Sequence, residues 1–299
     1  MRFSHVSSET SNEVTLVIMA AGMGSRFGGD KQLAEIGPEG EAILCYTLHD
    51  AALAGVNKLV LIVRSEIEEA LREHCARFAP KGMEIVTRCQ DKHGPSREKP
   101  WGTAHAVLSA ADAITTPFLV VNADDHYGRS AILSLVEYLK DPNRGKDGAI
   151  AGFHLAETLS PIGGVSRGVF TMDDQNYMSS IVETHDIERN ASGQITSDQG
   201  DLADDTLVSM QSWALDPSFL EPLQERFDAF VAANVGVPKA EFLLPDEIGK
   251  QVDEGRFRIK VLDTDAAWFG VTHGADLEPA QVEMKRLVDN GTYPAPLGG

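Results

Sequence analysis

The chain has 299 residues, 42% of them hydrophobic and 24% charged, which is typical of a folded globular protein rather than a disordered or membrane protein. Its 45 acidic residues outnumber the 26 basic ones and give a formal net charge of −19, so neither nucleic acid nor an anionic membrane is expected as a general partner. The same charge repels phosphorylated small molecules. A site for such molecules would therefore need local cations or a divalent metal ion.

The N-terminal region predicts neither a membrane span nor a signal peptide. The apolar run at 14–21 is shorter than the ~20 residues that a span requires, and Glu9 and Glu13 precede it where a signal peptide would carry basic residues. The three cysteines lie far apart and form no CxxC pattern, so we expect reduced thiols and a cytoplasmic protein. Residues 1–13 read as a flexible tail, and residues 14–299 as one domain.

In the first half, strand signals alternate with helix signals. Continuous apolar runs predict buried strands at 14–21, 58–63, 83–89 and 117–122. Helices are predicted around 44–52, after a capping box formed by Ser65 and Glu68, and at 103–111. This alternation predicts an α/β fold of Rossmann-like type, in which a mixed, mostly parallel central sheet is flanked by helices within a single domain.

The second half has a different pattern. Segments 163–172 and 178–184 read as short strands joined by turn residues, whereas the polar and acidic segment 194–205 reads as an exposed loop. Asp216-Pro217 predicts the start of a helix, and further helices are expected at 241–254 and 279–290.

The densest chemical signal is a glycine-rich loop at 20–31, directly after the first strand. Glycines permit tight turns that present successive backbone N–H groups to an anion, and Arg26 and Lys31 supply the positive charge that a triphosphate requires. The alternative is a plain turn with two solvated cations. The spacing excludes two common phosphate loops, because Phe27 stands where the dinucleotide fingerprint needs glycine and no Gly-Lys-Ser/Thr is present.

This loop resembles the G-x-G-[ST]-R-x(n)-K signature of the sugar-1-phosphate nucleotidyltransferases, which include the glucose-1-phosphate thymidylyl- and uridylyltransferases. Lys31-Gln32 is also similar to the Pro-Lys-Gln of cytidylyltransferases that act on alditol or methylerythritol phosphates. The resemblance covers nearly the whole chain after residue 13 and is more specific in the first half. It implies a nucleotide-binding half at 14–150 and an acceptor-binding half at 151–299.

Two further segments resemble the same family. The segment 99–107 is similar to the one in which a glycine abuts the nucleobase, so the resemblance implies that Gly102 approaches the base, with Gln90 as a base-reading side chain. A simple turn followed by an N-cap is the alternative reading of Gly102 and Thr103. On this resemblance the expected nucleotide-binding residues are Ala21, Gly22, Gly24, Ser25, Gln90, Gly102 and Thr103.

Asp124 and Asp125 follow the strand at 117–122, at the end of the strand where α/β sheets bind ligands. The segment resembles the family motif that holds Mg²⁺, and this implies that Asp124 is the metal ligand. Asp125 reads equally as a helix N-cap. The resemblance implies a second metal-binding aspartate at the position of Gly270, and the sequence leaves Asp246, Asp263 or Asp265 as substitutes.

The acceptor side also departs from the family pattern. Glu183 is retained as a contact for an acceptor hydroxyl, but Thr184 stands where relatives carry the lysine that meets the acceptor phosphate. Gly164, Arg167 and Lys239 are alternative neighbours of this site, and Arg167 is the preferred compensating cation. A surface arginine in a hairpin is the alternative reading.

The sequence therefore predicts an enzyme that transfers a nucleoside monophosphate from an NTP to a phosphorylated small molecule, with sugar 1-phosphate as the leading acceptor. Arg26, Lys31 and Asp124 are the expected catalytic residues, with Mg²⁺ as cofactor. A cytidylyltransferase for an alditol-type phosphate and a catalytically impaired nucleotide-binding regulator are the alternatives. A homo-oligomer is compatible with the sequence, which does not decide the oligomeric state.

Overall fold

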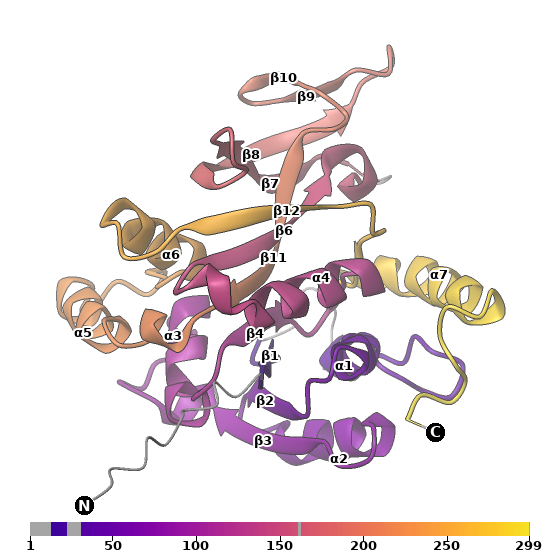
Figure 1. The fold of residues 1–299 in the computed structure, drawn as a ribbon, viewed down its shortest axis with the longest axis horizontal. Coiled ribbons are helices and arrows are strands. Elements are labelled where there is room, and N and C mark those ends of the chain that lie inside the picture. The colour runs from indigo at the N-terminus through magenta and orange to yellow at the C-terminus, as the bar shows by residue number, and fades with distance from the viewer. Residues whose placement is uncertain (1–12, 23–30, 161–162, 299) are drawn as a thin grey trace, which may run out of the picture.

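The fold is built around one large twisted sheet with helices on both faces (Figure 1). The computed structural model describes residues 13–22, 31–160 and 163–298. Residues 1–12 of the predicted tail and residues 23–30 of the loop lie outside this set. Within the described residues, the main sheet has 11 strands, in the order β10-β9-β8-β7-β11-β4-β1-β2-β3, with β6 paired to β11 and β12 paired to β6.

The parallel part of the sheet comes from the first half of the chain. It consists of β1 (Thr15–Met19), β2 (Lys58–Val63), β3 (Glu84–Cys89) and β4 (Phe118–Asn122). β1 lies between β2 and β4, parallel to both, and β2 is parallel to β3. The predicted strands at 58–63 and 117–122 are confirmed almost to the residue, because continuous apolar runs suit strands that are buried on both faces.

The second half extends the sheet mainly with antiparallel strands. They are β6 (Gly148–His154), β7 (Val165–Met172), β8 (Met178–Arg189), β9 (Ile195–Ser197), β10 (Gly200–Leu202), β11 (Leu207–Leu215) and β12 (Ile259–Thr264). β11 joins the two halves, since it pairs antiparallel with β4, β6 and β7 and its register shifts between Ser209 and Trp213. A small second sheet pairs β5 (Asp125–His126) with β13 (Phe269–Gly270).

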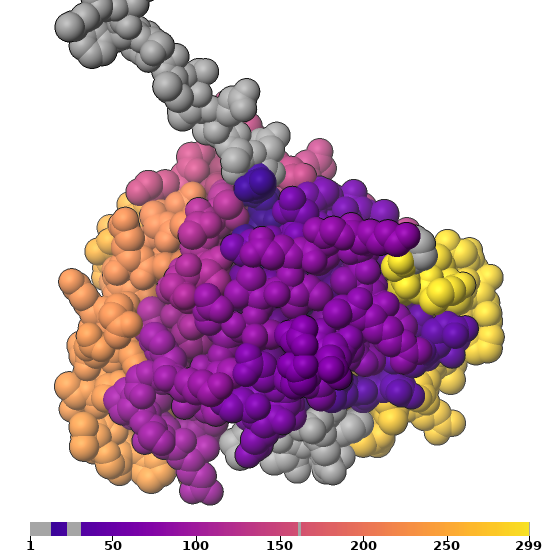
Figure 2. Space-filling view, turned by 90° about the horizontal axis from the view of Figure 1, so that it is seen from below, coloured from indigo at the N-terminus to yellow at the C-terminus, as the bar shows by residue number. Residues whose placement is uncertain are grey.

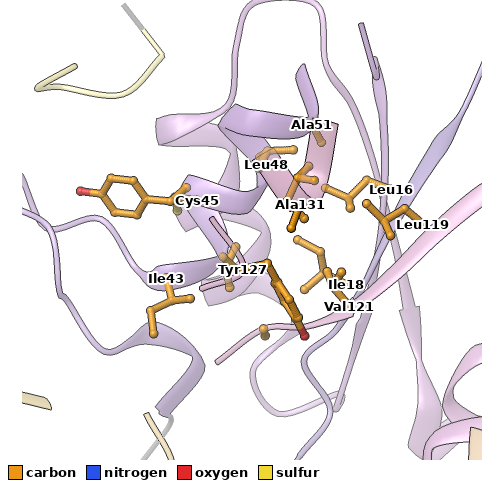
Figure 3. Packing of buried hydrophobic residues seen from close by; sticks show 14 of the residues in the cluster. Leu16, Ile18, Ile43, Cys45, Leu48, Ala51, Leu119, Val121, Tyr127 and Ala131 are labelled. Carbon is orange, nitrogen blue, oxygen red and sulfur yellow. The ribbon is translucent and has the colours of Figure 1, made fainter. Parts of the chain in front are cut away.

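Alternating residues of the parallel strands face two separate apolar cores. Leu16 and Ile18 of β1 point to the core that Figure 3 shows, where they meet Leu48 and Ala131. Val17 of β1 points to the opposite core. The first core is covered by α1 (Ile43–Leu53), α2 (Glu68–Phe78), α4 (Arg129–Lys140) and α7 (Leu277–Asp289), and the second by α3 (Thr103–Ser109), α5 (Leu223–Ala233) and α6 (Leu244–Asp253).

The two halves of the chain form one body. Figure 2 shows the first half in the middle of one face, with segments of the second half in orange and yellow on both of its flanks. α3 of the first half packs on α5 and α6 of the second half. No helix among the described residues has the length and apolar character that crossing a membrane requires.

Several local predictions were wrong. Glu68 does not form a capping box with Ser65, because it accepts a hydrogen bond from Thr87 Oγ1 at 2.6 Å. The expected loop at 194–205 contains the β9–β10 hairpin, whose small polar strands carry too little apolar pattern to be recognised. The helix expected from Asp216-Pro217 begins with the short 3-10 turn Pro217–Phe219, and α5 follows from Leu223.

A buried polar network fixes the C-terminal segment to α1, β5 and α4. The Tyr293 hydroxyl donates to Asp50 Oδ2 at 2.5 Å, while Arg129 Nε donates to Asp50 Oδ1 at 2.8 Å. His126 Nε2 lies 3.0 Å from the same hydroxyl, and because that hydroxyl donates to a carboxylate it accepts from His126. Burial raises the pKa of Asp50, so its carboxylate depends on these two donors.

Tyr293→Phe should lower the free energy of unfolding by about 1–3 kcal/mol, because Asp50 would keep its burial but lose one donor. Denaturant unfolding at pH 7 measures the change. Tyr177→Phe is the control, since Tyr177 is only half-buried and phenylalanine preserves its ring contacts with Arg258 and Lys260. Equal stability of Tyr293→Phe and the parent protein would contradict the role assigned to this network.

Candidate active site

The centre of the candidate site lies where β1 and β4 end side by side. The two strands are parallel, with Met19 opposite Asn122, so the segments that follow them leave the sheet at the same edge. Lys31 then forms an ion pair with Asp124 across 93 residues of sequence. Both side chains are about one-fifth exposed, so the pair is partly shielded from water but remains accessible to a ligand.

The described part of the glycine-rich loop is held to this edge by a buried amide. Gln32 Nε2 donates to the carbonyl of Gly22 at 2.7 Å, and Gln32 itself is 2% exposed. Ala21 is buried directly after β1, whereas Gly22 is exposed. The expected phosphate-binding residues Gly24, Ser25 and Arg26 lie outside the described residues.

Asp125 is part of the site and is not a helix cap. It lies in β5, and α4 begins after Gly128 with no side-chain cap. Asn122 Nδ2 donates to Asp125 Oδ2 at 2.9 Å, whereas Asp125 Oδ1 has no hydrogen-bond partner among the described residues. Burial, and then the neighbouring charge of Asp124, raise the pKa of Asp125 to about 7. Both effects disfavour the charged form, and the hydrogen bond from Asn122 and the charge of Lys31 oppose them.

Gly270 lies directly opposite Asp125 in the β5–β13 pair. A Cβ atom at Gly270 would lie 2.5 Å from Asp125 Oδ1 and 3.0 Å from the Trp268 ring. The space that a side chain at position 270 would occupy is therefore filled by the Asp125 carboxylate. Of the three proposed substitutes for a second metal ligand, Asp263 instead bonds to His154 at 2.8 Å, and Asp246 lies in the first turn of α6.

The three expected acceptor-side residues lie in or next to the β7–β8 hairpin. Arg167 is opposite Thr184 and Gly168 is opposite Glu183 in the pairing of these strands, while Gly164 packs against the backbone of Asp186.

Arg167 is the cation of this hairpin, and its guanidinium lies over the Trp268 ring at 5.1 Å. Desolvation lowers the pKa of Arg167, and the charges of Asp125 and Glu183 oppose that shift. The charges of Arg167 and Asp125 therefore act on each other, although the two residues belong to different halves of the chain.

Gly102 and Thr103 join α3 to the second half of the chain. Gly102 has a φ of +113°, and a Cβ atom there would lie 2.5 Å from the carbonyl oxygen of Phe242. The Thr103 hydroxyl accepts from the backbone N–H of Leu244 at 2.9 Å. The close approach of the Phe242 backbone is by itself enough to require glycine at position 102, and the contact with a nucleobase that the family resemblance implied stays a prediction.

Gln90 follows β3 and lines a cavity of about 230 Å³. Other walls come from Arg64 after β2, from Trp101 and His105, and from the segment 91–98. Arg97 holds this segment to the second half of the chain, because its guanidinium donates to the carbonyl of Ala240 at 3.0 Å. Gln90 is only 4% exposed, and its amide nitrogen donates to the carbonyl oxygen of Gly102.

Several residues of this region were not recognised from the sequence as a group. They are Asn122 and Tyr127 around Asp125, Trp268 beside Arg167, and His105 beside Gln90. Trp268 and His105 contact partners that are distant in the sequence. Asn122 and Tyr127 lie within three residues of Asp125, so the run from 122 to 127 offered a local signal.

The fold and the site define a nucleotide-handling α/β transferase, and comparison with known proteins agrees with this class. The family model described as the MobA-like NTP transferase domain matches residues 16–169, which is more than half of the chain. The chain therefore belongs to this family and is a nucleotidyltransferase. No curated protein is similar enough in sequence to match the chain.

Solved structures of low sequence identity share the fold over almost the whole chain. The inositol-1-phosphate CTP transferase from T. maritima has 16% identity and a TM-score of 0.63, with 92% of this chain and 96% of that chain covered. The UDP-glucose pyrophosphorylase from Acinetobacter baumannii has 16% identity and a TM-score of 0.60, with 95% of each chain covered. HddC from Yersinia pseudotuberculosis, complexed with GMP-PN, has 17% identity, a TM-score of 0.55, and coverage of 90% and 98%.

Gly102→Ala should destabilise the protein by about 1–3 kcal/mol, because a Cβ atom would collide with the Phe242 backbone in a conformation that favours glycine. Thermal unfolding measures the effect. Gly249→Ala is the matched control, since Gly249 lies within α6 and has open space around it. That control should be neutral or stabilising, and similar behaviour of the two variants would rule out the packing role of Gly102.

Proposed function

We propose that this nucleotidyltransferase joins a nucleoside monophosphate from an NTP to a sugar 1-phosphate and releases pyrophosphate. The observation that carries the proposal is the Lys31–Asp124 pair, which lies beside the glycine-rich loop at the edge of a parallel sheet. α/β proteins bind nucleotides at this edge. Arg26 and the loop amides would bind the β- and γ-phosphates, and Lys31 would contact the α-phosphate.

The reaction requires little more than alignment and charge neutralisation. A phosphate monoester has a second pKa of about 6, so the acceptor is already a nucleophilic dianion at neutral pH. Its oxygen attacks the α-phosphorus, the bond to the bridging oxygen breaks, and pyrophosphate leaves. No general base is needed, and Lys31 would stabilise the negative charge that builds up during the transfer.

The carboxylates of this site fit a magnesium ion. Asp124 and Asp125 each have one oxygen without a hydrogen-bond partner among the described residues, and oxygen donors are what Mg²⁺ prefers. The described residues contain no group of three or more His, Cys, Asp or Glu side chains suited to a metal, so phosphate oxygens and water would complete the coordination. Bound there, the ion would neutralise phosphate charge. Asp125 would supply the carboxylate that position 270 lacks.

The acceptor would bind on the β7–β8 side of the site. Arg167 is the cation of the hairpin that carries Glu183 and Gly164, and the charge of Asp125 acts on it. Arg167 would bind the acceptor phosphate in place of the lysine that Thr184 replaces, and Glu183 would contact an acceptor hydroxyl. Thr184 is buried, with 3% exposure, so it takes no part in this contact.

One substrate screen tests the two alternative functions, a cytidylyltransferase and a nucleotide-binding regulator. The T. maritima protein uses CTP and inositol 1-phosphate according to its name, which favours the cytidylyltransferase alternative. Four NTPs offered against sugar 1-phosphates, inositol 1-phosphate and alditol phosphates, with pyrophosphate release as the readout, would distinguish the acceptors. NTP binding without pyrophosphate release from any pair would support a regulator. A cytoplasmic location is also part of the proposal and rests on the sequence expectation.

Lys31→Ala and Asp124→Asn should each lower the rate of pyrophosphate release by about 10²–10³-fold, because each removes a preorganised charge at the reacting phosphate. Single-turnover kinetics at saturating NTP measures the chemical step. Circular dichroism and thermal unfolding confirm that the variants remain folded. Rates near that of the parent enzyme in a folded variant would refute the assignment of that residue.

A binding measurement then distinguishes the metal-binding role proposed for Asp124 from the charge-stabilising role proposed for Lys31. Mn²⁺ bound with NTP can be followed by electron paramagnetic resonance. Its affinity should fall in Asp124→Asn and Asp125→Asn but remain close to that of the parent enzyme in Lys31→Ala. Asp263→Asn is the control carboxylate, because Asp263 lies in β12 and pairs with His154.

Arg167→Gln should raise the KM for the phosphorylated acceptor by about 10-fold or more, because it removes a charge-assisted hydrogen bond. The KM for NTP should stay within about twofold. Initial-rate kinetics with each substrate varied in turn measures both. If only the KM for NTP rises, Arg167 interacts with the aspartates of the nucleotide site and not with the acceptor. Arg189→Gln, at the far end of β8, is the control.

A further inference from the structure

The Gln90 amide has its orientation fixed from two sides. Its Nε2 donates to the carbonyl oxygen of Gly102 at 2.9 Å and lies 3.1 Å from Nδ1 of His105. The opposite orientation would place the amide oxygen against that carbonyl oxygen, which is an acceptor and cannot donate. Both hydrogens of the amide nitrogen are therefore used within the protein.

His105 is itself restricted to one tautomer. Its Nε2 lies 3.0 Å from the carbonyl oxygen of His93, and this contact requires a proton on Nε2. The neutral ring then has an unprotonated Nδ1, which can only accept from Gln90. Burial lowers the pKa of His105 to about 4, so the ring stays neutral at physiological pH. Stacking on Phe227 at 4.6 Å fixes the plane of the ring.

These contacts leave a single polar group of Gln90 available to a ligand. Its Oε1 atom has no hydrogen-bond partner among the described residues, and the residue lines the cavity of about 230 Å³. Such a volume lies slightly below the ~300 Å³ at which pockets for whole small molecules begin. The cavity can therefore enclose a single planar ring system more readily than a complete nucleotide.

The position of the cavity fits the nucleobase end of an NTP. Gln90 follows β3 and Asp124 follows β4, and the order β4-β1-β2-β3 separates these ends by three strand spacings, or about 14 Å. The end of β1, after which the glycine-rich loop begins in the sequence, lies between them. A triphosphate held at this loop can extend its base toward β3 and its reacting phosphate toward Asp124.

We propose that His105 is a positioning residue that locks the Gln90 amide with Oε1 facing the cavity, so that this site reads an N–H donor on the nucleobase. This inference rests on the proposed function, because it assumes that an NTP is the ligand. His105 does not touch the base. It determines whether Gln90 can act as a donor or only as an acceptor, and so which edge of a base the site accepts.

The test is a double-mutant cycle measured with the four NTPs by calorimetry. His105→Phe keeps the stacking on Phe227 but removes the acceptor for the amide, and it should weaken binding of the preferred NTP by about 3–10-fold, as expected for one neutral hydrogen bond. The ratio between the affinity for the preferred NTP and the affinities for the other three should fall by the same factor. His105→Asn, which returns a polar acceptor near the Nδ1 position, should restore most of that preference.

The decisive measurement is the effect of His105→Phe in a Gln90→Met background. If His105 acts through Gln90, the second substitution changes neither affinity nor preference any further. An equal loss in both backgrounds would show a merely structural role and overturn the inference. His49→Phe is the control for a half-buried histidine outside the site. Should His105→Phe fail to fold, His105→Leu provides the same comparison.

The outcomes separate this inference from the function on which it rests. If the parent protein binds no magnesium–NTP complex, the proposed function and the inference both fail. If the parent protein binds NTP and releases pyrophosphate, but its base preference is the same in His105→Phe, only the inference fails.

Discussion

The parallel register of β1 and β4 is the constraint on which the candidate site depends. It brings the loop after one strand beside the aspartates that follow the other, so that Lys31 and Asp124 meet although 93 residues separate them. This local pairing is important for binding an anionic ligand, because the molecule has a net charge of −19. The aspartates would repel an incoming triphosphate, whereas the ammonium group beside them offsets part of that charge and stays accessible.

The second half of the chain completes the site that the first half begins. β13 brings Gly270 against Asp125, and the β7–β8 hairpin brings Arg167 into the same electrostatic environment. Because Asp125 fills the space next to Gly270, a side chain at position 270 and the present position of this carboxylate exclude each other. Under the proposed function, Asp125 would compensate for the departure from the family pattern at position 270, as expected of an active enzyme rather than of a regulator that has lost its metal site.

Contacts between the halves also fix the region around Gln90. The Phe242 backbone packs on Gly102, whose carbonyl oxygen holds the Gln90 amide, and Arg97 ties the segment 91–98 to residues 238–240. α5 supplies Phe227, on which His105 stacks. The side chains that would read a nucleobase are therefore positioned by the half of the chain that would bind the acceptor. A substitution in one half can therefore alter the geometry of the other half, because packed elements and not a flexible linker connect the two.

The sequence alone determined the parallel part of the sheet, the class of enzyme and the placement of Asp124 at the end of a strand. Apolar runs that end in glycine or aspartate carry the information on the strands locally, whereas the class of enzyme was implied by the resemblance of the glycine-rich loop and other segments to the nucleotidyltransferases. The sequence did not reveal β6, β11 and β12, because their pairing is decided by distant strands and not by their own pattern. It also left open whether Asp125 caps a helix, and it gave no sign that the Phe242 backbone packs on Gly102. The reason is physical. Which groups share a site depends on tertiary packing, since the space beside Gly270 and beside Gly102 is filled by residues distant in the sequence.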